Sequence, residues 1–248
     1  MQISTIPVGL GQKSAQGELS NAVRPNNVIT TIPVEAYVAT LDDDMPKASS
    51  VEEFMNLFAA GGEFKLEGNM ELTETPILSE DVETTIVLNG KKVIAPEATE
   101  GKTDSTCFQV DAGHLVLQGE GEVIAQDAEY SNAVYARGGQ VDILGGSYSN
   151  AGDNCDLIYA AGSAQINIYD GIFKATKNNG ADGTANEYPA LNVKDGDRAT
   201  AKITVYGGKF YKFNPADNFS EGSNTNFVAE GYESVQEGDW WVVRPIEG

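Results

Sequence analysis

Basic residues and histidine are scarce in this sequence. Lys and Arg together number 16 against 37 Asp and Glu in 248 residues, which gives a formal net charge of −21 at pH 7, and His114 is the single histidine. Binding to nucleic acid or to an anionic membrane surface needs clustered Lys and Arg, so we expect neither partner. We expect His114, which follows Gly113, to be a turn residue rather than a general base.

The sequence also lacks long apolar runs and is poor in cysteine. No run is long enough to cross a membrane, and residues 1–7 lack the basic start and apolar core of an export signal. We therefore expect a protein that is made in a cytoplasm and stays there, or assembles there into a particle. Cys107 and Cys155 are predicted to lie two repeats apart, about 9.6 Å at a strand spacing of about 4.8 Å. A disulfide spans about 4.4–6.8 Å between Cα atoms, so we expect two free thiols.

What the sequence does contain is a short pattern that returns four times, a glycine followed two residues later by an apolar residue. The four copies are Gly121-Glu122-Val123, Gly146-Ser147-Tyr148, Gly171-Ile172-Phe173 and Gly208-Lys209-Phe210. The first three copies are 25 residues apart, and the fourth regains this interval once about twelve residues around the polar insert at 178–186 are set aside. A repeat of this length indicates stacked units, none of which buries its apolar face alone.

Each unit also contains two segments in which apolar and polar residues alternate, as in a strand with one buried face. Three short strands per turn of about 25 residues predict an all-β fold, a right-handed parallel β-helix, in which equivalent side chains stack about 4.8 Å apart. In the first segment the predicted inward ladder is Phe108, Val134, Ile158 and Leu191, and the outward ladder is Gln109, Tyr135, Tyr159 and Asn192. Near a bend, the predicted stack is Tyr148, Phe173 and Phe210.

Residues 1–49 do not fit the repeat, and residues 50–248 are predicted to form the capped β-helix domain. The first segment is rich in proline and has too few apolar residues for a core of its own. It is either disordered or an extended arm that becomes ordered against a partner. The arm residues expected to make that contact are Ile29, Ile32, Val34, Tyr37 and Val38. Ser50 and Glu53 form a capping box, which predicts a short helix over 51–60 that covers the open end of the β-helix.

The two ends of the domain resemble a known family. Gly-Gly-Glu-Phe-Lys-Leu at 61–66, followed by Val-Leu-Asn-Gly-Lys-Lys-Val-Ile at 87–94, looks like the opening of pectate-lyase-like right-handed β-helix proteins. Residues 208–216, 227–232 and 240–243 resemble the C-terminal turn of β-helix proteins from gut bacteria and their phages. The resemblance covers about residues 50–245. It implies the fold, which hosts lyases, hydrolases, adhesins and inert fibres alike.

No catalytic residue, metal site or cofactor is predicted. The second outward ladder, Val116, Asp142, Asn167 and Thr204, offers no paired acids beside a base, as a polysaccharide-active enzyme requires, and neither does the first. The acids of residues 42–44 lack the spacing of a calcium loop, and residues 195–198 are expected to be a turn. Tyr135 and Tyr159 leave three interpretations open: a ladder that stabilises the sheet, a protein interface or a sugar-binding surface.

These features together predict a non-enzymatic phage virion protein, similar to the head-fibre or capsid-decorating proteins of crAss-like gut phages. Residues 1–49 are expected to anchor it to capsid or other virion proteins, with the β-helix projecting from the virion surface. We expect a homo-oligomer, a trimer in preference to a dimer, and host glycans as a further partner. The alternatives are a polysaccharide-active β-helix enzyme, such as a lyase or tail-spike depolymerase, and a free carbohydrate-binding module.

Overall fold

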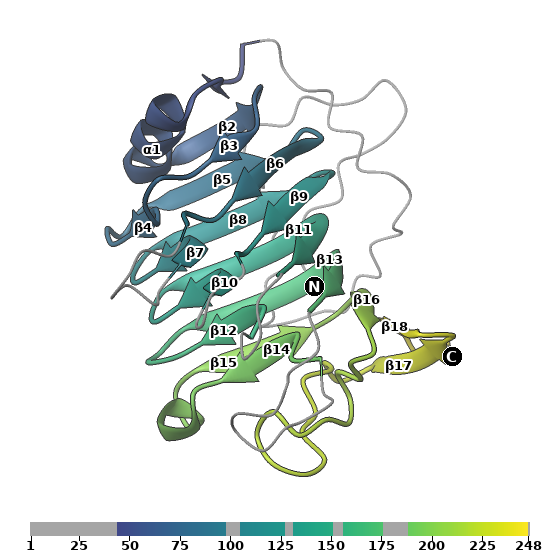
Figure 1. Ribbon diagram of the computed structural model, residues 1–248. Helices are drawn as coiled ribbons and strands as arrows, with labels where there is room; N and C mark the ends of the chain where they lie inside the picture. Colours follow the sequence, from purple (N-terminus) through teal and green to yellow (C-terminus); the bar gives the residue numbers. More distant parts are fainter. Residues whose placement is uncertain (1–43, 98–104, 127–130, 151–155, 176–187, 248) are drawn as a thin grey trace, which may run out of the picture. The chain divides into compact units, whose positions relative to one another are not determined.

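The computed structural model describes residues 44–97, 105–126, 131–150, 156–175 and 188–247. The chain divides into two units, Met1–Pro46 and Lys47–Gly248, and the second contains the helix and the strands labelled in Figure 1. Three of the predictions fall outside the described residues: the five contact residues of the arm, the thiol of Cys155 and the polar insert at 178–186. They stay predictions.

Where it is described, the second unit is mostly β-strand with one α-helix, α1 (Val51–Ala60), and one 3₁₀ turn, η1 (Asp195–Asp197). Its first strands are β1 (Lys47–Ala48), β2 (Gly62–Leu66), β3 (Met70–Glu71), β4 (Ile77–Leu78), β5 (Glu83–Val87), β6 (Lys91–Ile94), β7 (Ser105–Val110), β8 (His114–Gln118) and β9 (Gly121–Ile124). The others are β10 (Ser131–Ala136), β11 (Gln140–Ser149), β12 (Ile158–Ala160), β13 (Gln165–Lys174), β14 (Leu191–Val193), β15 (Lys202–Val205), β16 (Gly208–Tyr211), β17 (Tyr232–Glu237) and β18 (Trp240–Pro245).

These strands form two sheets in which nearly all neighbours run parallel (Figure 1). The smaller sheet has the order β14-β12-β10-β7-β4, and the larger follows the path β1-β2-β5-β8-β11-β13-β16-β18-β17, with β3, β6, β9 and β15 beside it. The antiparallel exception is β18, which pairs with β16 on one side and β17 on the other. The fold is therefore all-β and dominated by parallel strands, as the repeat predicts.

The pairing register follows the period of the sequence. Val134 pairs with Phe108 in one neighbouring strand and with Ile158 in the other, and Ile158 pairs with Leu191. All four side chains are fully buried. The predicted inward ladder is thus confirmed, and since a slip of one residue would turn every side chain to the other face, the outward ladder is fixed with it.

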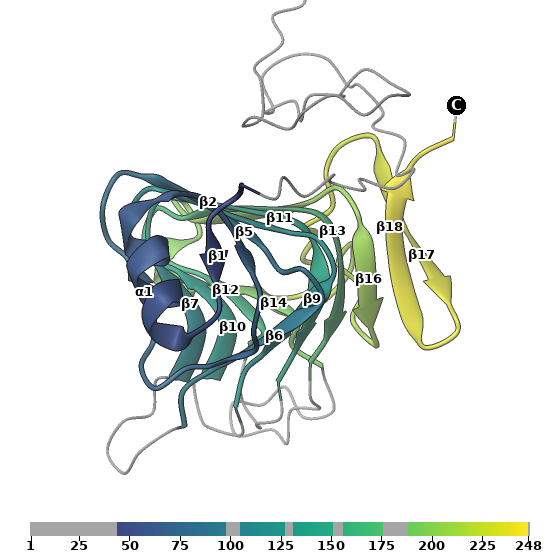
Figure 2. The same cartoon turned by 90° about the horizontal axis from the view of Figure 1, so that it is seen from above.

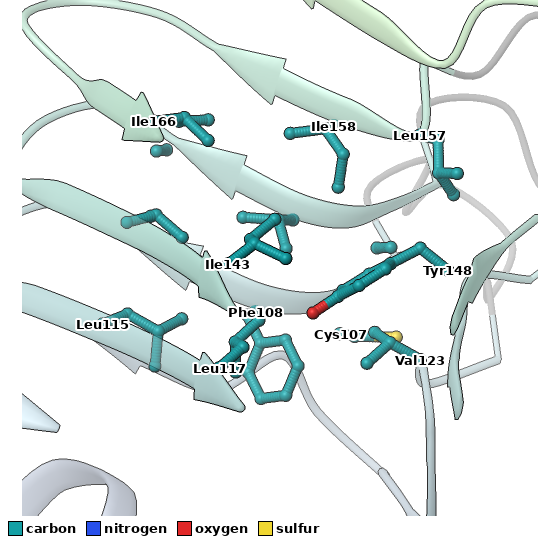
Figure 3. Close-up of a cluster of buried hydrophobic side chains, with 14 of the residues drawn as sticks. Cys107, Phe108, Leu115, Leu117, Val123, Ile143, Tyr148, Leu157, Ile158 and Ile166 are labelled. Carbon is teal, nitrogen blue, oxygen red and sulfur yellow. The ribbon is translucent and has the colours of Figure 1, made fainter. Parts of the chain in front are cut away.

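The hydrophobic core lies between the inner faces of the two sheets. Figure 3 shows Phe108 and Ile158 from the smaller sheet pointing toward Leu117 and Ile143 from the larger one. Cys107 is a buried free thiol within this core, as predicted, and burial raises the pKa of that thiol. The core is continuous because successive parallel strands of each sheet add equivalent apolar side chains to it.

The long strands β11 and β13 bend where the repeated glycines lie. Their register shifts between Ile143 and Ser147, across a segment that contains Gly146 at φ 93°. Beyond the bend, the ring of Phe173 lies between Tyr148, at a centroid distance of 5.0 Å and an interplanar angle of 8°, and Phe210, at 4.7 Å and 10°. The predicted aromatic stack is confirmed.

Helix α1 covers one end of the stack, beside β2 and β4 (Figure 1). The predicted N-cap is present, with its return bond shifted by one residue: Glu53 N–H donates to Ser50 Oγ at 3.2 Å, and Glu53 Oε2 accepts from the N–H of Ser49, rather than of Ser50, at 2.8 Å. Phe54 and Phe58 are buried and contact Phe64 and Phe108 through their rings. The helix therefore completes the core at this end.

The second unit, Lys47–Gly248, which we call the β-unit, begins slightly earlier than the boundary predicted between residues 49 and 50. Lys47 and Ala48 form β1, which pairs parallel with Lys65 and Leu66 of β2, and Ala48 is fully buried. These two residues belong to the sheet rather than to the arm. Pro46 is the last residue of the first unit, because β1 begins directly after it.

Candidate functional site

The predicted outward ladder lies on the outer face of the smaller sheet. Tyr135 of β10 pairs with Gln109 of β7 and with Tyr159 of β12, and Tyr159 pairs with Asn192 of β14. Ile77 of β4 pairs with Gln109 at the other end and is 46% exposed. These five side chains form one row across the sheet, which we call the tyrosine row. Its geometry is as predicted, and its binding role stays a prediction.

The two tyrosine rings of the row are stacked at a tilt. Their centroids are 5.4 Å apart and the rings are inclined by 33°. Burial, together with the charge of Asp156 and then that of Tyr135, raises the pKa of Tyr159 to about 12. The phenol is therefore neutral at physiological pH and can donate a hydrogen bond.

Beside Gln109, Asp111 joins the ends of the neighbouring strands β7 and β10. Arg137 Nε donates to Asp111 Oδ1 at 2.8 Å, and Gln109 Nε2 donates to the two carboxylate oxygens at 3.0 and 3.2 Å. The guanidinium of Arg137 is the main reason that the pKa of Asp111 lies below its usual range. Gln109 is thus held in place by the ion pair beside it.

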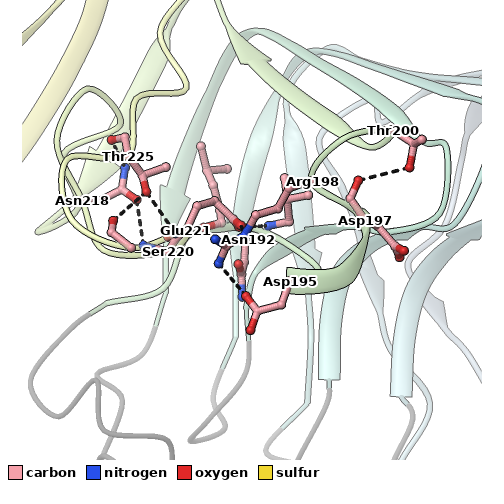
Figure 4. Close-up of polar contacts among 12 residues, drawn as sticks. Asn192, Asp195, Asp197, Arg198, Thr200, Asn218, Ser220, Glu221 and Thr225 are labelled. Carbon is pink, nitrogen blue, oxygen red and sulfur yellow. Dashed lines mark hydrogen bonds and ion pairs between the residues drawn. The ribbon is translucent and has the colours of Figure 1, made fainter.

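At the Asn192 end, a polar cluster closes the row (Figure 4). Asn192 Nδ2 donates to Asp156 Oδ2 at 2.8 Å, and Arg198 forms ion pairs with both Asp195 and Glu221. Asp195 to Asp197 form the 3₁₀ turn η1, so residues 195–198 are a turn, as predicted. The sequence does not predict the ion pair of Glu221 with Arg198, because Glu221 lies in a loop that no sequence pattern places beside β14.

Glu221 and Ser220 cover the exposed edge of β14. Glu221 Oε1 accepts from Val193 N–H at 2.7 Å, and Ser220 Oγ donates to Leu191 O at 2.7 Å. Unpaired backbone groups at a sheet edge invite pairing with another chain, and these side chains satisfy them. Burial raises the pKa of Glu221, although Val193 N–H and Arg198 act against that rise. Beside them, Asn192 Oδ1 is buried with no hydrogen-bond partner in the described part of the chain.

A second polar network, on the outer face of the larger sheet, is centred on His114. His114 Nδ1 lies 2.9 Å from Glu83 Oε2, and His114 Nε2 lies 3.0 Å from Asp142 Oδ2. Gln140 and Asn167 donate to the same Asp142 carboxylate at 2.9 Å. The prediction that His114 is a turn residue is wrong: His114 begins β8 and lies between two carboxylates.

The network shifts the pKa of both its central groups. Burial acts to lower the pKa of His114, but the hydrogen bonds and charges of Asp142 and then Glu83 outweigh it, so this pKa is raised. Burial acts to raise the pKa of Asp142, but His114, Asn167 and Gln140 outweigh it, so this pKa is lowered. A protonated His114 therefore links the strands β5, β8 and β11.

We expect this link to make stability depend on pH. His114 binds its proton more tightly folded than unfolded, so its contribution is complete below the unfolded pKa of about 6.5 and is lost as pH rises through the higher folded pKa. The contribution of Asp142 is present above its unfolded pKa of about 3.9 and is lost as pH falls through the lower folded pKa.

Urea unfolding of the native chain and of His114→Gln measures this dependence. The free energy of unfolding of the native chain should exceed that of the variant most at about pH 5. This difference should shrink toward pH 9, well above the unfolded histidine pKa of about 6.5. His114 is the single histidine of the sequence, so the variant has no histidine left to titrate in this pH range. A difference that is constant with pH, or that grows above pH 7, would contradict the assignment.

Among the described residues, no group of three or more His, Cys, Asp and Glu side chains could hold a metal ion. The described helix is also not of the length and apolarity that crossing a membrane requires. No family model, curated protein or solved structure matches the chain. The candidate site presents two phenols between two amides, and each amide contacts a carboxylate.

Proposed function

We propose that Lys47–Gly248 folds as a right-handed parallel β-helix. Each coil contributes three parallel runs, such as β10, the first half of β11 up to Ile143, and its second half from Ser147. Equivalent residues of successive coils pair along all three runs, for instance Tyr148 with Val123 and with Phe173. Crossovers between parallel strands are right-handed in nearly all proteins, which favours that hand here, as does the resemblance to pectate-lyase-like proteins.

On this fold we propose a non-enzymatic virion structural protein of phage, a head fibre or capsid decoration. The observation that carries the proposal is that Lys47–Gly248 closes its own core with β1 and α1, through Ala48, Phe54 and Phe58. A unit with its own covered end needs nothing from residues 1–46 for packing. Those residues are then available to anchor the chain to capsid or other virion proteins, by strand addition or wrapping.

The proposed protein is displayed on the virion surface as a homo-oligomer, with a trimer preferred to a dimer. The tyrosine row is the proposed contact for host glycans, through Gln109, Tyr135, Tyr159 and Asn192. Rigid phenols between hydrogen-bonding amides can stack on a sugar ring and bond its hydroxyls. The partners at either end, Asp111 and Asp156, hold the two amides in fixed positions.

Removal of the arm tests the proposal. A chain that begins at Pro46 should unfold at nearly the same urea concentration as the full chain, because β1 and α1 are retained, yet fail to form oligomers or to co-sediment with virus particles. The matched control is the full-length chain with Ile29, Ile32 and Val34 replaced by serine, which keeps the length of the arm. Misfolding of the shortened chain would place the arm in the core, and normal assembly would remove the anchoring role.

One observation favours the alternative of a polysaccharide-active enzyme. The charges of Asp156, Asp195 and Glu221 all raise the pKa of Tyr159, which shows that these three acids gather at one end of the tyrosine row. Each of them also has a structural hydrogen bond or ion pair, and for that reason we prefer a structural role. Release of reducing sugar ends from a polysaccharide by the native chain, lost in Glu221→Gln, would reverse this preference.

A further inference from the structure

A third outward surface lies over β13, β16 and β18, which are neighbours in the larger sheet (Figure 2). Phe173 of β13 pairs with Phe210 of β16, and both point inward. The next residues along these strands, Lys174 and Tyr211, therefore point outward side by side. Tyr211 in turn pairs with Trp240 of β18. This surface is formed by other strands than the tyrosine row.

Three aromatic rings meet on this surface without being buried in the core. The Tyr211 ring is 5.6 Å from that of Tyr188, at an interplanar angle of 89°, and 5.2 Å from that of Trp240, at 63°. All three side chains are half-buried. Rings set edge to face in this way hold one another in fixed orientations and leave apolar ring surface in contact with water.

Two lysines accompany the rings. Lys174 Nζ and Lys212 Nζ each lie 5.3 Å from the centroid of the Tyr211 ring, and Lys212 Nζ lies 5.4 Å from that of Tyr188. The sequence has few basic residues beside its 37 acids, so two exposed ammonium groups converging on one ring are a local exception to the charge of the chain. A hydrogen bond to Tyr211 and the charge of Asp239 raise the pKa of Lys212, which keeps it protonated.

The backbone at Lys212 is strained in a way that fixes this geometry. Its φ is 51°, in the left-handed region that residues other than glycine seldom adopt. The strain is held by a hydrogen bond from Lys212 N–H to Asp239 O at 2.8 Å, which joins the residue after β16 to the turn between β17 and β18. Backbone strain of this kind persists where surrounding structure over-determines it, and it clusters at binding sites.

We propose that this surface, which we call the aromatic–lysine face and define as Lys174, Tyr188, Tyr211, Lys212 and Trp240, binds an anionic saccharide. The apolar side of a sugar ring packs on aromatic rings, and its carboxylate or sulfate receives charge-assisted hydrogen bonds from the two ammonium groups. The proposal goes beyond the virion role and does not depend on it, since it concerns a face of the β-unit itself.

The nearby carboxylate of Asp239 and the negative charge of the chain set the selectivity of the face for anionic ligands. Asp239 Oδ2 lies 4.0 Å from Lys212 Nζ, and both side chains are exposed, so this weak ion pair yields to a ligand anion. The overall negative charge repels polyanions from the rest of the chain. A bound anionic sugar is therefore directed to this face, where ammonium groups lie over aromatic rings.

The test measures binding of the full chain to three charged oligosaccharides, each beside a neutral counterpart. The pairs are oligogalacturonide and its methyl ester, sialyllactose and lactose, and a heparin-derived hexasaccharide and its desulfated, carboxyl-reduced form. At least one charged member should bind at least about tenfold more tightly than its counterpart, with affinity falling as salt rises. The pair that responds distinguishes carboxylate from sulfate recognition.

Variants locate the site. Lys174→Ala, Lys212→Ala and Trp240→Ala should each weaken binding at least about tenfold, and Asp239→Asn should strengthen it by removing the competing carboxylate. Lys202→Ala, which removes an exposed lysine of β15 outside both surfaces, is the matched control and should leave binding unchanged. Lys174 is exposed, so its variant keeps the fold even if the loss of Trp240 disturbs the hairpin, and urea unfolding checks each variant.

Several outcomes would overturn the proposal. It fails if none of the three charged oligosaccharides binds, if the neutral counterparts bind equally well, or if Lys202→Ala weakens binding as much as Lys174→Ala does. It also fails if the lysine variants change only the sedimentation of the chain, because the face is then an interface between copies. Failure of the virion role, in contrast, appears as normal assembly without residues 1–45 and does not affect these measurements.

Discussion

Replacement of Phe173 by alanine is expected to lower the free energy of unfolding by about 3–5 kcal/mol, the range for large aromatic residues removed from packed cores. The Phe173 ring is fully buried and stacks on Tyr148 at 5.0 Å and on Phe210 at 4.7 Å. Its removal leaves a cavity between two rings that belong to different coils. The three rings lie on the paired strands β11, β13 and β16, so the surroundings can relax only in part to fill the cavity.

The control is the neighbouring residue on the same strand. Ile172 points outward and is 44% exposed, so Ile172→Ala should change the free energy of unfolding by less than about 1 kcal/mol, as surface substitutions usually do. Urea unfolding at equilibrium measures both variants. A loss below about 1 kcal/mol for Phe173→Ala, or equal losses for the two, would show that the aromatic stack carries little of the stability.

The features that the sequence predicts well are those that repeat. The glycine-x-apolar pattern places Tyr148, Phe173 and Phe210 at one position of successive coils, and the alternation that precedes it places Val134 between Phe108 and Ile158. In a parallel stack the pairing partner of a residue lies about one period away, and the alternation of apolar and polar residues then selects the exact partner, since the pairs Phe108–Val134 and Val134–Ile158 are 26 and 24 residues apart. The capping box likewise defines the start of α1, because its two side-chain bonds are local.

The features that the sequence does not predict join residues at unequal distances along the chain. His114 contacts Asp142, 28 residues later, and Glu83, 31 residues earlier, and neither spacing equals the period of 25 residues. Glu83 pairs directly with His114, but across an interval of 31 residues, whereas Asp142 lies diagonally, two residues beyond Gln140, the direct partner of His114. The contact to Asp142 could have been predicted from the strand register. Gln140 pairs with His114, and Asp142 follows Gln140 by two residues on the same face.

The candidate sites divide in the same way. The tyrosine row follows from the period, whereas Glu221 and Ser220 reach β14 from an irregular loop whose path no repeat determines. The aromatic–lysine face is the intermediate case. Lys174 and Tyr211 are equivalent positions of two coils, but Trp240 arrives through the antiparallel hairpin of β17 and β18, which departs from the parallel stack.

The second large effect is expected at the other end of the stack, where Phe54→Ala should cost about 3–5 kcal/mol. Phe54 is fully buried, and its ring lies 5.9 Å from that of Phe58, 6.0 Å from that of Phe64 and 6.3 Å from that of Phe108. It therefore connects the helix to two coils of the sheets. Its loss removes packing from three rings at once and loosens the cover over the first coil.

This variant is also expected to associate, since the end of a stack of parallel strands exposes both apolar core and unpaired backbone groups once its cover is loosened. The control is Asn56→Ala, an exposed position of the same helix, where alanine has the higher helix propensity and no core contact is lost. Urea unfolding and sedimentation velocity should show Asn56→Ala unchanged, and Phe54→Ala destabilised and forming larger species as its concentration rises. If Phe54→Ala loses stability but stays at the size of the native chain, β1 alone shields the end of the stack, and the helix serves packing rather than protection of the sheet edge.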